Sequence, residues 1–158
     1  MSDAALVEEL QEAIASGRTV AIVGTGVSII ASGDPEVDGH HVARWDGLLR
    51  HGLHQCRNVE KVFDDKSSRV VEIQLETGEL DFLISAAELI TGRLRKLAPG
   101  VFHRWLRDSI GKLKPLPTQT ILHTLSAWPG ILATLNYDHL FEDATDRRPI
   151  TWRDEAKI

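Results

Sequence analysis

The sequence predicts an α/β domain, with a parallel sheet flanked by helices, from two apolar segments and from the helical periodicity of the chain between them. Residues 20–23 and residues 131–134 are apolar runs of strand length that end abruptly at small or polar residues. The first run is rich in β-branched residues, which is typical of a strand that helices cover on both faces. A chain of 158 residues can bury one core, so we expect a single domain over residues 1–158.

The expected helices follow from apolar periodicity and end at proline or glycine. Residues 1–17 form an acidic amphipathic stretch, and a second helix is expected over residues 45–57. Residues 57–117 keep the helical period with a break at Pro99-Gly100, so we expect them to form a helical insertion between the two strands. A further helix over residues 118–128 leads through a turn into the second strand.

The sheet is expected to be incomplete at its C-terminal end. A helix over residues 137–144 follows the second strand, and residues 150–152 are the candidate for a third strand. Because the sequence stops soon after that candidate begins, we expect it to be the N-terminal piece of a larger protein. An unfinished sheet leaves apolar surface and an unpaired edge, so we also expect a homo-oligomer or contact with further domains or subunits.

Small residues follow the first strand. Gly24 and Gly26 lack side chains, which permits a tight turn and also lets phosphates approach the backbone amides, and Ser28 adds a hydroxyl. A strand-to-helix turn alone is the alternative reason for the two glycines. The full dinucleotide fingerprint has a third glycine where Ile29 stands, and the Gly-Lys-Ser/Thr of a nucleoside triphosphatase is absent.

Polar residues follow the second strand. Asn136 and Asp138 come just past its end and before the expected helix. Carboxamide and carboxylate groups at a strand end can hydrogen-bond ribose hydroxyls or position a water molecule. Both residue types also cap helices, so capping is the alternative role for this pair.

These segments resemble a known family. Residues 24–28 read Gly-Thr-Gly-Val-Ser and resemble the Gly-Ala-Gly-Ile-Ser of sirtuins, and residues 32–35, Ser-Gly-Asp-Pro, are similar to their Ser-Gly-Ile-Pro. Residues 134–138 read Thr-Leu-Asn-Tyr-Asp and are most similar to the Thr-Thr-Asn-Tyr-Asp of sirtuin-like NAD hydrolases of prokaryotic antiviral defence. Residues 45–49 fit the Trp-x-x-Leu-Leu of that branch.

The resemblance implies a Rossmann-like sheet and a hydrolase, acting in antiphage defence, that takes NAD as its substrate and releases nicotinamide and ADP-ribose. It implies two catalytic residues: Asn136, which orients the ribose and the attacking water, and Asp138, which supports the nicotinamide ribose or carboxamide. It also implies a dinucleotide-binding set that consists of Gly24, Thr25, Gly26, Ser28, Pro35, Asn136 and Asp138.

The chain also departs from the family pattern. Cys56 is the single cysteine, so the zinc ribbon of the protein deacylases is ruled out and deacylation is disfavoured. Leu135 stands where deacylases have glutamine. Family enzymes use a histidine downstream of the asparagine motif to assist proton removal, and no histidine follows His139, which is expected on a helix surface. We therefore expect little NAD hydrolysis by this chain alone. The alternative function is a non-catalytic nucleotide-binding or assembly module of a larger complex.

Composition excludes further function classes. The formal net charge of −5 argues against general nucleic-acid binding, and the locally basic residues 93–114 are interpreted as solvated helix faces. The sequence has no apolar run long enough for a bilayer and no signal peptide, which predicts a cytoplasmic protein without membrane contact.

The histidines do not predict a metal site. His51 and His54 share one face of the expected helix, while Cys56 points away from that face. His40-His41 is expected in a polar loop.

Overall fold

The computed structural model describes residues 3–145 and 149–151. The chain is a mixed α/β protein that divides into two compact units, one comprising Met1–Ala31 and Lys114–Ile158, the other Ser32–Leu113. The second unit contains most of the segment expected as a helical insertion. It begins earlier than that expectation, at Ser32, because the helix that starts at Trp45 packs against the later helices of the same unit.

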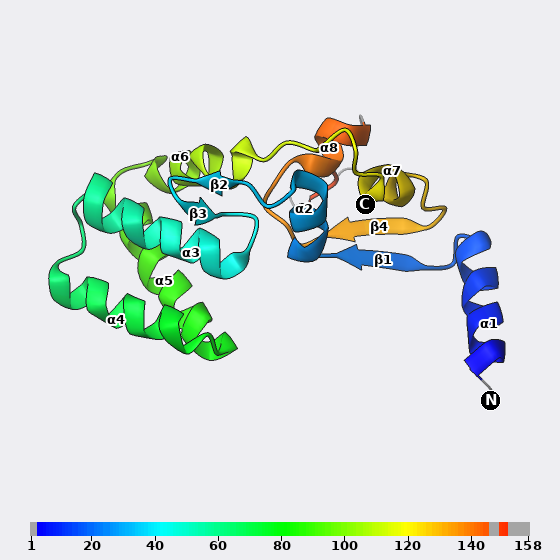
Figure 1. The fold of residues 1–158 in the computed structure, drawn as a ribbon, viewed down its shortest axis with the longest axis horizontal. Helices are drawn as coiled ribbons and strands as arrows, with labels where there is room; N and C mark the ends of the chain where they lie inside the picture. Colours follow the sequence, from blue (N-terminus) through cyan, green and yellow to red (C-terminus); the bar gives the residue numbers. More distant parts are fainter. Residues whose placement is uncertain (1–2, 146–148, 152–158) are drawn as a thin grey trace. The chain divides into compact units, whose positions relative to one another are not determined.

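The first unit is built on a parallel pair of strands. Strand β1 (Val20–Val23) pairs with β4 (Ile131–Thr134), so that Val20 lies opposite Ile131 and Val23 opposite Thr134. Both arrowheads in Figure 1 point toward the end of the sheet where α2 begins. The two expected strands and their parallel direction are therefore confirmed, and the carboxyl ends of both strands meet at one edge.

Helices α2 (Thr25–Ser32), α7 (Ile121–Ser126) and α8 (Leu140–Thr145) flank this small sheet. Helix α1 (Asp3–Ala15) precedes β1 and has no buried residue. Helices α7 and α8 pack against each other and bury Leu122 and Leu140. Helix α7 is shorter than expected, because a turn closed by the Gln119 N–H and the Leu116 carbonyl (3.0 Å) precedes it. Most of the segment 24–28, expected as a tight turn, is helical, since α2 already begins at Thr25.

One face of the sheet is open in the described part of the chain. The side chains of Val20, Ile22 and Ile131 are 57 %, 67 % and 66 % exposed, whereas Val23 on the opposite face is buried. The expectation that helices cover both faces of β1 is therefore wrong for one of them. Ile150 and Thr151 are irregular, and Trp152, the last residue of the candidate third strand, lies outside the described residues.

The second unit begins with a short hairpin. Strands β2 (Glu36–Val37) and β3 (His40–His41) pair antiparallel, and Asp38 and Gly39 between them have φ angles of +50° and +77°. Two positive φ angles are the mark of a type I′ turn, for which Asp-Gly is a preferred sequence. The polar loop expected around His40-His41 is therefore wrong.

Helices make up the rest of this unit, as the apolar period predicts. They are α3 (Trp45–His54), the π-helical turn η1 (Gln55–Val59), α4 (Asp65–Thr77), α5 (Leu80–Leu97), α6 (Val101–Asp108) and the 3-10 turn η2 (Ile110–Lys112). Helix α4 is capped by Asp64, whose side chain accepts a hydrogen bond from the Ser67 N–H (2.8 Å). Their packing buries Leu49, Val71, Leu75, Ile90, Leu94 and Trp105. None of the helices in the described ranges is sufficiently long and apolar to cross a membrane.

Candidate functional site

The two segments that resemble the sirtuin motifs meet at the carboxyl edge of the sheet. Gly24 follows β1 directly, and Asn136 comes two residues after β4. The Leu135 N–H donates to the Val23 carbonyl (3.0 Å), which continues the strand pairing by one residue. The parallel register therefore brings residues 24 and 136, far apart in sequence, within hydrogen-bonding distance.

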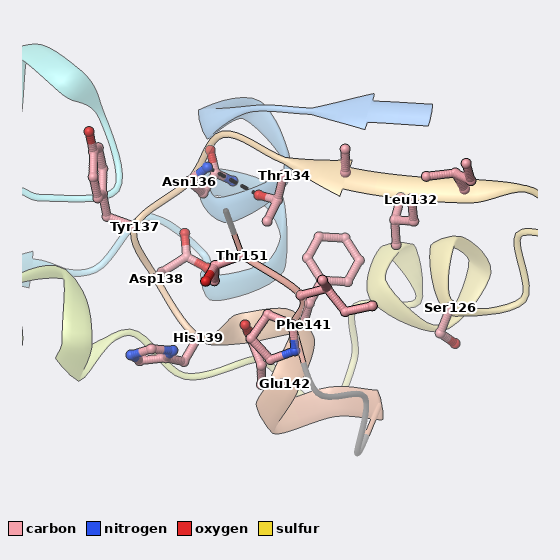
Figure 2. Close-up of a pocket in the computed structure, with 14 residues that line it drawn as sticks. Ser126, Leu132, Thr134, Asn136, Tyr137, Asp138, His139, Phe141, Glu142 and Thr151 are labelled. Atoms are coloured by element: carbon pink, nitrogen blue, oxygen red, sulfur yellow. Dashed lines mark hydrogen bonds between the residues drawn. The ribbon is translucent and has the colours of Figure 1, made fainter. Parts of the chain in front are cut away.

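Asn136 joins the two segments through its carboxamide. Its Nδ2 donates to the Gly24 carbonyl (3.0 Å) and to Ser28 Oγ (2.8 Å). A carbonyl oxygen only accepts hydrogen bonds, so the amide nitrogen must face Gly24, and this fixes the direction of Oδ1. The backbone N–H of Asn136 donates to Thr134 Oγ1 (3.1 Å), which holds the residue at the strand end (Figure 2).

Asn136 Oδ1 is a buried acceptor, and the described residues provide it with no hydrogen-bond donor. Leaving such an atom unpaired costs about 1–3 kcal/mol, so a buried polar atom of this kind calls for a water or ligand partner. Because both Nδ2 hydrogens are engaged, Asn136 can offer a ligand only an acceptor.

Ser28 and Asp138 complete the cluster. Ser28 is 2 % exposed, and its hydroxyl donates to Asp138 Oδ2 (2.5 Å). Asp138 Oδ1 accepts from the backbone N–H of Leu140 (3.1 Å), the first residue of α8. The helix-capping alternative is therefore confirmed for Asp138 but wrong for Asn136, whose side chain bonds to Gly24 and Ser28 instead.

The glycines of this segment have no packing role that the described residues reveal. A Cβ added at Gly24 or at Gly26 would meet nothing within 4 Å. Neither residue has a positive φ angle, so the turn from β1 into α2 does not require glycine. The turn alternative is thus not supported. The open space beside both residues fits close approach of a ligand to the first turn of α2. The Val27 N–H in that turn already donates to the Gly24 carbonyl (3.0 Å), so the N–H groups of Thr25 and Gly26 are the ones that a ligand would meet.

A cavity of about 740 Å³ opens beside this cluster. Figure 2 shows Asn136 and Asp138 toward one end of it and Leu132 and Ser126 toward the other. Its titratable lining side chains are Tyr137, Asp138, His139 and Glu142. Residues 24–28 do not line it.

The predicted site residues therefore fall into three groups. Gly24, Ser28, Asn136 and Asp138 share one hydrogen-bonded cluster. Thr25 and Gly26 adjoin that cluster, exposed in the first turn of α2. Pro35 is exposed between α2 and β2 and belongs to the second unit.

Sequence reasoning missed several residues of this site. Thr134 anchors the backbone of Asn136, and His139, expected on a helix surface, precedes α8 and lines the cavity with Phe141 and Glu142. The threonine at the last position of a strand was a usable signal, because a hydroxyl there can accept from the N–H two residues later. The cavity lining combines residues of β4, of α8 and of the segment between them, an arrangement that no local sequence pattern encodes.

Searches against protein-family models, curated proteins and solved structures find no match.

In the described ranges, no three side chains of the metal-binding types converge in a way that could hold an ion.

Cys56 is buried, and burial raises the pKa of its thiol to about 12. A thiol with so high a pKa stays protonated near neutral pH.

Proposed function

We propose that residues 24–28 and 136–138 form the NAD-binding site of a sirtuin-like NAD hydrolase domain with a Rossmann-like sheet, acting in antiphage defence. The observation that carries this proposal is the carboxamide of Asn136, which joins the two motif segments and leaves Oδ1 as a buried acceptor without a donor among the described residues. A ribose hydroxyl or a water molecule supplies such a donor.

The proposed reaction breaks one bond and forms one. The bond between the nicotinamide nitrogen and C1′ of its ribose breaks through an oxocarbenium-like state, and nicotinamide leaves with the bonding pair. A water oxygen bonds to C1′ and loses one proton, which gives ADP-ribose. Asn136 Oδ1 accepts from the ribose or from this water, and the N–H groups in the first turn of α2 face the pyrophosphate.

The attacking water must also lose its proton to a base. The described cavity offers Asp138, His139 and Glu142 as acceptors near the cluster. Asp138 already accepts from Ser28 through Oδ2 and from the Leu140 N–H through Oδ1, so both of its carboxylate oxygens have partners within the protein. We therefore assign Asp138 a role in substrate binding. A group other than Asp138 takes the proton of the attacking water.

The test is calorimetric titration of the chain with NAD, together with chromatographic assay of released nicotinamide. We expect Asn136→Ala to weaken NAD binding at least about tenfold, since about 1.4 kcal/mol of binding energy corresponds to that factor. Asn58→Ala is the matched control, because Asn58 is an exposed asparagine in η1 of the other unit. Equal NAD affinity in the parent and in Asn136→Ala contradicts the proposed site.

A second candidate function is a non-catalytic assembly module. The open apolar face of the sheet, formed by Val20, Ile22 and Ile131, favours it, because contiguous exposed aliphatic side chains mark contact surfaces. The calorimetric titration with NAD distinguishes the two functions. An assembly module without a nucleotide site gives no heat of binding, whereas a NAD-binding site does.

A further inference from the structure

Three imidazole rings gather inside the second unit. His40 comes from β3, and His51 and His54 come from successive turns of α3. Their ring centroids lie 6.0 Å apart for His40 and His51, 6.0 Å for His40 and His54, and 6.4 Å for His51 and His54. His51 is 3 % exposed and is the buried member of this histidine cluster.

The hydrogen bonds of His51 fix its protonation state. Trp105 Nε1 on α6 donates to His51 Nδ1 (3.0 Å). An indole N–H can only donate, so Nδ1 must carry a lone pair and the single ring proton must sit on Nε2. Nε2 faces Asp38 Oδ2 at 3.3 Å. His51 is thus a neutral imidazole with both nitrogens engaged, which leaves it no atom for a metal ion.

Close packing holds the Trp105 indole against α3. Trp105 is 3 % exposed, and a Cβ at Gly52 would lie 2.9 Å from Cζ2 of the indole and 2.9 Å from Cγ2 of Ile90. Such a separation is too short for carbon atoms in contact, so the indole occupies the space that any larger residue at position 52 needs. The ring has little room to turn toward another acceptor.

We propose that His51 and Trp105 form a pH-sensitive latch that holds α6 on α3 while His51 is neutral and releases it when His51 takes up a proton. A protonated imidazole is a donor at both nitrogens. Nδ1–H then faces the Trp105 N–H, so two buried donors oppose each other and a charge is buried as well.

The charged and titratable groups that act on His51 come from α3, from η2 and from the hairpin turn. Burial is the first cause that lowers its pKa, and His54 on α3 and Lys112 on η2 lower it further, while Asp38 in the hairpin turn raises it. The pKa of His40 is also lowered, by burial first and then by His51, His54 and Arg50. Asp38 is 66 % exposed, so solvent screens its stabilising effect.

The direction of the pH effect follows from these lowered pKa values. The unfolded chain binds protons near the ordinary histidine pKa of 6.5, whereas folded His51 and His40 bind them only at lower pH. The stabilising contribution is therefore complete above pH 6.5 and is lost as pH falls through the folded pKa values. Each such histidine changes the opening equilibrium by up to about tenfold per pH unit in that window.

The first measurement is NMR of the full chain, with long-range nitrogen correlation of the imidazoles. We expect His51 to be protonated at Nε2 and unprotonated at Nδ1, and to titrate below the ordinary histidine pKa of 6.5. A His51 that is protonated at Nδ1, or that titrates at pH 6.5 or above, overturns the latch.

The second measurement is hydrogen exchange of the Trp105 indole N–H and the α6 amides at pH 7 and pH 5, corrected for intrinsic exchange rates. We expect protection to fall at least about tenfold in the parent. His51→Asn keeps an acceptor at the position of Nδ1 but does not titrate, so its protection should persist at pH 5. His103→Asn is the control and should lose protection as the parent does. Equal loss in His51→Asn, or no loss in the parent, contradicts the proposal.

Discussion

Ser28 has more influence on the candidate site than its small side chain suggests. Its buried hydroxyl accepts from Asn136 Nδ2 and donates to Asp138 Oδ2, so it fixes both polar groups at the end of the sheet. Neither bond lies within one secondary-structure element. The serine therefore links the parallel strand register to the orientation of two polar side chains of the candidate site.

Replacing Ser28 tests this connection. Ser28→Ala leaves one donor of Asn136 and one acceptor of Asp138 without their partner, so we expect the free energy of unfolding to fall by about 1–3 kcal/mol. NAD affinity should fall as well, because the Asn136 carboxamide loses one of its two anchors. Urea unfolding and calorimetry measure the two effects.

Ser16→Ala is the control for this change. Ser16 is an exposed serine at the end of α1, and its loss should alter the free energy of unfolding by no more than about 0.5 kcal/mol. A fully stable Ser28→Ala variant with unchanged NAD affinity shows that the hydrogen bonds of Ser28 do not organise the site.

The sequence identified the side chains of this cluster but not their bonds. Small and polar residues after two apolar runs were enough to select Gly24, Ser28, Asn136 and Asp138. Which oxygen accepts from which nitrogen depends on the register of β1 against β4, a non-local pairing that no short segment specifies. For the same reason, a capping role of Asn136 could be excluded only once its hydrogen-bond partners were known.

At the level of elements, helix α2 offers the clearest test of the phosphate-binding proposal. Gly26 lies in its first turn, with open space where a Cβ would be. Gly26→Ala should therefore leave the free protein as stable or stabilise it by up to about 1 kcal/mol. If the pyrophosphate binds where we propose, the added methyl occupies the space through which it approaches the backbone, so NAD binding should weaken at least about tenfold.

Gly92→Ala is the matched control for Gly26→Ala. Gly92 also lies within a helix, α5, and a Cβ there also meets nothing within 4 Å. The same gain in helix stability is expected, without any effect on NAD affinity. If both variants bind NAD as the parent does, the first turn of α2 does not contact the dinucleotide.

Elements with a clear apolar run or a long helical period were predicted correctly from the sequence, and short irregular segments were not. The apolar runs of β1 and β4 and the long helical period of α5 each correspond to an element of the structure. The β2–β3 hairpin was missed although Asp38-Gly39 is a type I′ turn sequence, because its strands have two residues each and no visible alternation. Helix α2 was not predicted, because the two glycines suggested a tight turn.

For the whole molecule, the open face of the β1–β4 sheet predicts self-association. Val20, Ile22 and Ile131 are aliphatic and mostly exposed on it. Ile22→Lys places a charge in the middle of this face, so we expect a lower average mass by light scattering at equal concentration. Ile84→Lys, at an exposed position on α5, is the control and should leave the mass unchanged.

An equal mass for the parent and for Ile22→Lys contradicts a role of this face in association.

The alternation of exposed and buried residues along β1 could not be predicted from its sequence. All four residues of the strand are apolar, and a continuous apolar run fits a doubly covered strand as well as a half-open one.

The most direct test of the central claim is a titration of the isotopically labelled chain with NAD, followed by NMR of individual groups. If the dinucleotide binds where we propose, the largest shifts should occur at the Asn136 side-chain amide and at the backbone N–H groups of Thr25 and Gly26, with no comparable change in α4 or α5. Absence of shifts at saturating NAD, or shifts confined to residues outside 24–28 and 134–142, contradicts the account.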